Sequence, residues 1–192
     1  MALLEVAKRK QFFKELGLGE YNATNIKKLQ KKYMLRKSDW DGIYGQNTDN
    51  LLRHLYNVLK HANPKNFRPE EFVCECGGKY CTGYPNYMKA KQMEHLQTIR
   101  NHYNRPMIIT CGLRCKKQNE IVKGIASSKH LNGKATDFYM RGVTDTLANR
   151  IKAIKYIKTL KNSAYCYGDG IDSNGGTERK EGMGNALHTD TK

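Results

Sequence analysis

The sequence predicts an α+β fold in which a small three-helix bundle precedes a small antiparallel sheet with flanking helices. Apolar residues recur at helical spacing three times before residue 62. After residue 69, short strand-like runs alternate with helical patterns. Pro64 and Pro69 interrupt any helix between the two parts. We therefore expect two domains, at residues 1–62 and 63–192.

The first domain should contain three helices. A weak apolar pattern over residues 3–16 ends at two glycines, and a second helix opens at Thr24. The run at residues 38–45 has an Asp-Gly step and a second glycine, which mark a tight turn. A third helix is expected over residues 46–61, where the inward face would carry Leu51, Leu52, Leu55 and Leu59.

The second domain should alternate between helices and strands. It opens with a cysteine-rich loop at residues 74–84 and a helix over residues 87–103. Strands are expected at 106–110, 135–140 and 164–167 and around His188. Helical patterns at 116–123 and 144–160 separate them, and a glycine-rich polar stretch covers residues 168–184. This order predicts a small antiparallel sheet.

The chain is strongly basic. Its 34 Lys and Arg residues against 18 Asp and Glu give a formal net charge of +16, which favours polyanions such as nucleic acid, anionic membranes or cell-wall polymers. The basic residues are spread out and are not interleaved with aromatic ones, so we do not expect nucleic acid as the partner. We find no apolar run of about 18 residues that would span a membrane, and the first residues do not read as a secretory signal.

A metal site is predicted by the run from Ser128 to Asp137. His130 and Asp137 lie seven residues apart with Gly133 between them, and His188 follows near the end of the chain. Two imidazoles and one carboxylate form the ligand set that holds a catalytic zinc with one position open to water. An arbitrary His and Asp at this spacing are usually surface residues, but the surrounding Ser, Gly and Ala residues favour the metal site.

The segment from about residue 66 to residue 192 resembles a known family. The matching residues are, in order, Asn66-Phe67, Glu71-Phe72 with Cys74, Thr110-Cys111-Gly112-Leu113-Arg114, Asn119, the run from Ser128 to Asp137, and His188-Thr189-Asp190. They resemble the zinc D-alanyl-D-alanine carboxypeptidases and L-alanyl-D-glutamate endopeptidases of peptidoglycan, in particular their cell-wall peptidase branch. The resemblance implies a zinc metallopeptidase that hydrolyses peptidoglycan, as a D,D-carboxypeptidase or an endopeptidase.

The resemblance also implies roles for individual residues. His130, Asp137 and His188 would be the zinc ligands, and Arg114 would bind a carboxylate or carbonyl of the substrate. The alternative for Arg114 is a surface arginine that caps the next helix. Ser128 would either hydrogen-bond near the metal and the substrate or cap the turn.

The proton acceptor departs from the family pattern. Several members carry Glu or Asp three residues before the last zinc histidine, where this chain has Asn185, and an amide cannot accept the proton. Asp190 is the first candidate for the catalytic base, although it would serve equally well to orient His188. Glu178 and Glu181 are weaker candidates. Because of Asn185, the alternative function is a non-catalytic wall-binding protein that keeps the zinc fold.

The cysteines predict a second metal site. Cys74, Cys76 and Cys81 are close enough in the sequence to share a structural zinc, with Cys115 as a candidate fourth ligand. Disulfides and buried free thiols are the alternatives, since six cysteines allow fifteen pairings. A nucleophilic cysteine is not expected, because no Cys and His form a catalytic pattern.

The first domain has a resemblance of its own. Ile26, Leu29-Gln30, Tyr33, Asp41-Gly42-Ile43-Tyr44-Gly45, Thr48, Leu51, Leu52 and Leu55 resemble the small helical peptidoglycan-binding domain. The resemblance implies that this domain holds the enzyme on the cell wall; an unrelated bundle that only stabilises the fold is the alternative. Without a secretion signal, the combination of a wall-binding domain and a wall-hydrolysing domain favours an endolysin of a bacteriophage or prophage. It would act at the bacterial wall after release through a pore, or on the virion tail beside other tail or lysis proteins.

Overall fold

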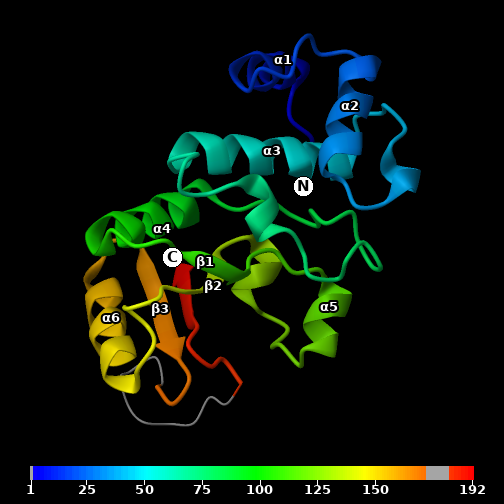
Figure 1. Ribbon diagram of the computed structural model, residues 1–192. Coiled ribbons are helices and arrows are strands. Elements are labelled where there is room, and N and C mark those ends of the chain that lie inside the picture. Colours follow the sequence, from blue (N-terminus) through cyan, green and yellow to red (C-terminus); the bar gives the residue numbers. More distant parts are fainter. Residues whose placement is uncertain (1, 172–181) are drawn as a thin grey trace.

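The predicted α+β class is confirmed by the computed structural model, which describes residues 2–171 and 182–192. Three helices come first: α1 (Val6–Glu15), α2 (Ala23–Tyr33) and α3 (Gln46–His61). Three more belong to the second part of the chain: α4 (Ala90–Tyr103) and α6 (Leu147–Thr159), which pack on the sheet, and the short α5 (Lys116–Ile121). The strands are β1 (Ile108–Cys111), β2 (Ala135–Tyr139), β3 (Ser163–Gly168) and β4 (Leu187–Thr191), and the 3₁₀ turns are η1 (Lys37–Asp39), η2 (Pro69–Phe72) and η3 (Lys129–Asn132) (Figure 1).

The four strands form one antiparallel sheet in the order β1-β2-β4-β3. One face of this sheet packs on α4. There the Gln92 amide donates to the Thr136 hydroxyl and the Thr189 carbonyl, each at 3.2 Å, and His95 contacts the Thr189 hydroxyl at 2.9 Å. Successive side chains of a strand point to opposite faces. The residues next to Thr136 and Thr189, which include Asp137 and His188, therefore point away from α4.

Helix α3 joins the first helices to the rest of the chain, and Figure 1 shows it lying between α2 and α4. Asn50 and Asn57 donate from their side-chain amides to the carbonyls of Pro85 and Met88. The fully buried His54 contacts the Pro69 carbonyl at 2.9 Å and accepts from the Met88 backbone N–H, while burial lowers its pKa to about 4. Around these polar contacts, the buried apolar side chains of the first three helices and of the sheet region form one continuous hydrophobic core. The domain boundary at residues 62 and 63 stays a prediction.

Gln30 organises the first three helices. Its side chain is buried, and the two hydrogens of its amide nitrogen are shared among Asp41, the Ile43 carbonyl and Thr48, which lie 2.9 to 3.0 Å away. Its oxygen accepts from the Gly42 backbone N–H at 2.8 Å. Satisfying all these groups at once fixes the turn between α2 and α3. The residues that resemble the peptidoglycan-binding domain thus support the fold of this bundle, and their binding role stays a prediction.

Two of the differences from the sequence prediction concern the surroundings of His130. The helix expected from residue 87 begins at Ala90, because the Lys89 backbone N–H donates to the Gly133 carbonyl at 2.8 Å and holds the preceding chain against η3. His130, expected on a loop, lies within η3. Within the described residues, no helix combines the length and apolar character needed to cross a bilayer.

Candidate metal centre

The strand register places Asp137 beside His188. On adjacent strands these two residues are directly opposite each other, with Cys111 opposite Asp137 on one side and Tyr167 opposite His188 on the other. Opposed residues of antiparallel strands have neighbouring side chains on the same face. The four residues form a row across the whole sheet, on the face away from α4, and two of the three predicted metal ligands stand next to each other in it.

His130 reaches this row from η3, which leads into β2. Its Nδ1 lies 2.8 Å from the Gly112 carbonyl oxygen, so Nδ1 carries the hydrogen and donates it. That tautomer leaves the lone pair on Nε2, which faces Asp137 and His188. A backbone carbonyl that fixes the ring in this way is the usual support of a zinc-binding histidine.

Two glycines make this approach sterically feasible. A Cβ on Gly112 would lie 2.6 Å from the Phe72 Cα, so a larger residue would push the strand end away from η2. Gly133 ends η3 with φ +67°, and a Cβ there would lie 2.0 Å from the Tyr87 carbonyl oxygen. Both glycines are therefore required where the chain folds His130 over the sheet.

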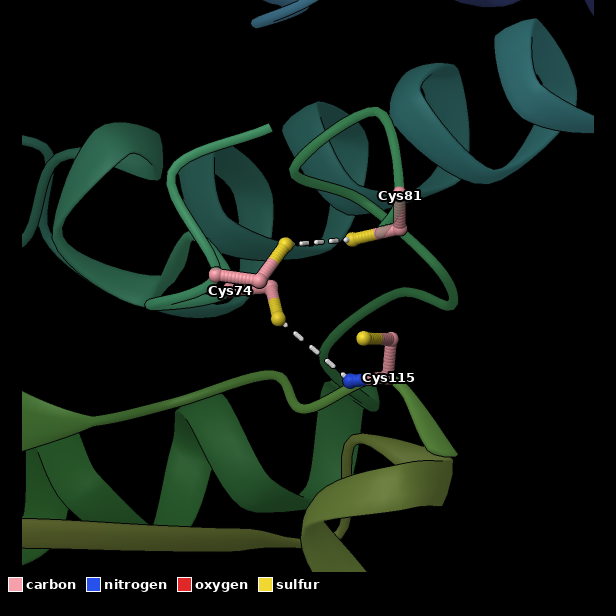
Figure 2. A group of neighbouring side chains, drawn as sticks. Cys74, Cys81 and Cys115 are labelled. Carbon is pink, nitrogen blue, oxygen red and sulfur yellow. Dashed lines mark hydrogen bonds between the residues drawn. The ribbon is translucent and has the colours of Figure 1, made fainter. Parts of the chain in front are cut away.

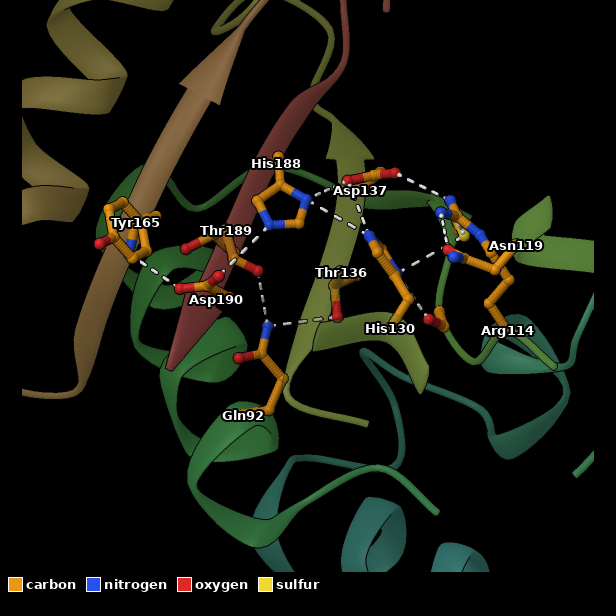
Figure 3. Close-up of polar contacts among 12 residues, drawn as sticks. Gln92, Arg114, Asn119, His130, Thr136, Asp137, Tyr165, His188, Thr189 and Asp190 are labelled. Carbon is orange, nitrogen blue, oxygen red and sulfur yellow. Dashed lines mark hydrogen bonds and ion pairs between the residues drawn. The ribbon is translucent and has the colours of Figure 1, made fainter. Parts of the chain in front are cut away.

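The three predicted ligands converge on one point (Figure 3). His130 Nε2 lies 3.3 Å from both His188 Nδ1 and Asp137 Oδ1, and the latter two atoms are 2.7 Å apart. A tetrahedral zinc with bonds of about 2.0–2.1 Å has ligand atoms separated by about 3.3 Å. The ligand types and the two separations that involve His130 thus fit a zinc ion, while the 2.7 Å between His188 Nδ1 and Asp137 Oδ1 is a hydrogen-bond distance that would widen around the ion.

Electrostatics also favour a cation here. Burial alone would lower the pKa of His130, but its contact with Asp137 raises that pKa to about 9. Burial would raise the pKa of Asp137, but the two imidazoles hold it well below its usual range. The pKa of His188 is raised by the carboxylates on either side of it, against the effect of burial. Without metal, the carboxylates thus favour protons on the two imidazoles, and a bound cation would displace the proton from His130 Nε2 and take its place.

A cleft of about 830 Å³ opens over the three ligands. Arg114 lines it, with Nη2 lying 3.8 Å from Asp137 Oδ2 and 3.1 Å from Cys111 Sγ. Its Nη1 donates to the Asn119 side-chain oxygen at 3.3 Å, and Asn119 in turn donates to the carbonyls of Gly124 and Ile125. Arg114 is thus held beside the metal site by several contacts, which disfavours the alternative of a simple surface arginine.

One family model, described as Peptidase M15, matches residues 65–170, just over half of the chain. The chain belongs to the peptidase M15 family. Peptidases of this family are zinc-dependent metallopeptidases with peptidoglycan as their general substrate, in agreement with the ligand set. The match includes Arg114, His130 and Asp137 but ends before His188, which is assigned to the centre by its position alone. No curated protein matches this chain.

In this M15 peptidase, Asp190 lies on the far side of the His188 ring from the other two ligands. Its Oδ2 is 3.6 Å from His188 Nε2, whereas Nδ1 of the same ring faces Asp137, and its Oδ1 accepts from the Tyr165 backbone N–H at 2.8 Å (Figure 3). A base must reach the water at the open position of the metal. Of its two expected roles, this placement favours orientation of His188.

The structure of the M15 peptidase also places Asn185 and Ser128. The Asn185 side-chain oxygen accepts from Arg150 at 3.2 Å, so it contributes to packing beside α6. Ser128 is buried at the edge of the cleft, and its side chain does not cap η3. Glu178 and Glu181 lie outside the described residues.

Sequence reasoning missed two side chains of the centre. Tyr167 stacks on His188 with ring centroids 4.5 Å apart, and burial raises its pKa to about 12, so its hydroxyl stays protonated. Glu75 interacts electrostatically with Arg114, Asp137 and His130, while burial raises its pKa. The alternation of residues 164–167 places Tyr165 and Tyr167 on one face, but it does not reveal which strand lies beside them. We find no sequence signal for Glu75.

Proposed function

We propose that this M15 peptidase hydrolyses peptide bonds in the stem or crossbridge peptides of bacterial peptidoglycan. The observation that supports the proposal most strongly is the convergence of His130, Asp137 and His188 under a cleft that Arg114 also lines. The cleft is open to solvent and large enough for a short peptide.

The side chains have distinct tasks in this reaction. When bound, zinc supplies a Lewis acid that polarises the scissile carbonyl and activates water. Arg114 holds a substrate carboxylate or carbonyl by hydrogen bonds from its guanidinium, which Asn119 keeps in place. Tyr167 packs against the face of His188 and helps to fix the plane of that ring. Tyr165, which is 56% exposed at the rim, offers an aromatic surface to the peptide.

The proposal is tested by digesting purified peptidoglycan and identifying the released muropeptides by mass spectrometry. We expect new amino groups and a defined set of cleaved peptides, both absent after treatment with a chelator and restored by zinc. The masses decide between a D,D-carboxypeptidase and an endopeptidase. Binding to sedimented wall without new amino groups, under conditions that load the metal site, would contradict hydrolysis and favour the non-catalytic alternative suggested by Asn185.

We further propose that the first three helices and the charge of +16 concentrate the enzyme on the wall. Wall binding should weaken as salt is raised, because screening reduces attraction to anionic wall polymers. Sedimentation of the intact chain with purified wall at several salt concentrations measures this. A role as a bacteriophage or prophage lysin, released through a pore or carried on a virion tail, stays a prediction.

The role of Asp190 is tested by Asp190→Asn. If Asp190 orients His188, the variant should bind zinc about 10- to 100-fold more weakly, and added zinc should restore hydrolysis. If Asp190 is the base, zinc affinity should be unchanged while kcat falls at every zinc concentration. Zinc titration alongside hydrolysis distinguishes the two outcomes. Glu75→Gln is the matched comparison, since it removes another carboxylate that interacts with the centre but has no contact with His188 in the structure.

A further inference from the structure

Four cysteines gather beside the catalytic centre. The sulfur atoms of Cys74, Cys76, Cys81 and Cys115 all lie within 4.8 Å of one another. Three come from the loop after η2 and the fourth from the residue before α5, and in Figure 2 the labelled side chains point toward a common centre from these two segments. A tetrahedral zinc with Zn–S bonds of about 2.3 Å separates its sulfurs by about 3.8 Å. The Cys76 and Cys81 sulfurs, at 3.4 Å, are close to that spacing.

The backbone around the cluster is arranged for thiolates. The Cys115 N–H donates to Cys74 Sγ and the Gln118 N–H donates to Cys115 Sγ, each at 3.4 Å. The loop itself is closed by the Cys74 N–H, which donates to the Gly83 carbonyl at 2.8 Å. Such N–H···S contacts stabilise negative charge on sulfur and orient it.

A cation also stands near the cluster. Arg36 interacts electrostatically with Cys76 and Cys81, and its segment is tied to the loop by the Leu35 N–H, which donates to the Thr82 carbonyl at 3.0 Å. Four thiolates around one divalent ion keep a net negative charge, which the Arg36 guanidinium offsets only in part because it is also paired with Asp39 at 2.7 Å. The ligand set and the hydrogen bonds to sulfur therefore favour a thiolate-binding metal ion.

We propose that these four cysteines bind a second zinc ion with a structural role. All four ligand positions are filled by protein, so no position is open for water or substrate. The site joins the loop after η2 to the segment between β1 and α5. That segment carries Gly112, whose carbonyl orients His130, and Arg114, which is adjacent to Cys115. The second zinc thus stabilises the segment that positions the catalytic centre.

The remaining thiols are distinct from this site. Cys111 Sγ lies 3.6 Å from His130 Nδ1, but that nitrogen already donates to Gly112, and Cys111 accepts from Arg114. Cys166 is fully buried in β3. Among the described residues no pair of cysteines is joined by a disulfide, and the 3.4 Å between Cys76 and Cys81 exceeds the bond length of about 2.05 Å.

Metal analysis of the purified full chain tests the proposal without reference to hydrolysis. We expect about two zinc ions per chain in the unmodified protein and about one in a His130→Ala/His188→Ala variant. X-ray absorption of the zinc in that variant should show only Zn–S distances of about 2.3 Å. A variant free of zinc, or one whose zinc has nitrogen and oxygen ligands, would overturn the cysteine site. So would a Cys76–Cys81 disulfide found by mass spectrometry of the unmodified protein.

Cysteine variants provide the matched comparison. Cys76→Ser/Cys81→Ser should retain about one zinc and unfold at a lower temperature than the unmodified protein. Zinc that binds only to the native state stabilises that state, and the variant lacks the zinc at the cysteine site. Cys166→Ala removes a buried thiol away from the cluster and should retain about two zinc ions. Equal zinc contents in these two variants would contradict the proposal. If the double variant fails to fold, the absorption spectrum of the histidine variant still decides.

Discussion

Replacing His130 by alanine should abolish zinc binding at the catalytic centre and reduce peptidoglycan hydrolysis to the background rate. The substitution removes one of three ligands and leaves Asp137 and His188 unable to complete the site. Loss of an outer support of a zinc ligand already weakens binding about 10- to 100-fold, so loss of the ligand itself should cost more. Zinc content, hydrolysis of purified wall and the zinc-dependent shift in Tm measure the effect.

A surface histidine serves as the control for this experiment. His61 lies at the end of α3, contacts Glu94 at 2.8 Å and does not line the cleft. His61→Ala should keep the full zinc content and activity of the unmodified protein. His188→Ala should behave as His130→Ala does. Undiminished hydrolysis by either ligand variant would remove the basis for a zinc mechanism at this site.

The ligand set was accessible from the sequence because it depends on local chemistry. His130 and Asp137 are joined by a short turn whose glycine is sterically required, so their spacing carries most of the geometric information. His188 lies far along the chain, and only the pairing of β2 with β4 brings it opposite Asp137. The family resemblance supplied that pairing indirectly, by naming His188 as the third ligand, and the register shows how the fold achieves it.

The parts that the sequence left open depend on tertiary contacts. Asp190 and His188 were expected on one side of a strand, but which ring nitrogen faces the metal decides whether Asp190 reaches the water or the back of the ring. Tyr167 contacts His188 only through the β3–β4 register. The cysteine cluster needs Cys115 to approach a loop whose last cysteine, Cys81, lies 34 residues earlier in the chain. No local spacing rule gives these distances.

Replacing Arg114 by alanine should lower kcat/KM by about 100-fold or more while the zinc content stays unchanged. Removing one preorganised donor from a transition-state site typically costs about 10²–10³ in rate. Arg114→Lys should recover little, because an ammonium cannot reproduce the contacts that the guanidinium makes with Asn119, Cys111 and Asp137 together. Steady-state kinetics on a defined wall peptide, with zinc measured in parallel, separates this effect from metal loss.

The structure gives a reason to expect that Arg114→Ala lowers kcat in addition to raising KM. Arg114 lies 3.8 Å from Asp137, so its charge acts on a metal ligand in addition to any substrate group in the cleft. Removing a residue that binds the substrate equally in the ground state and the transition state would raise KM and leave kcat unchanged. Arg141→Ala removes an exposed arginine outside the cleft and should leave both constants unaltered. An Arg114→Ala enzyme with normal kcat would therefore restrict Arg114 to substrate binding, and normal kcat/KM would exclude it from the reaction.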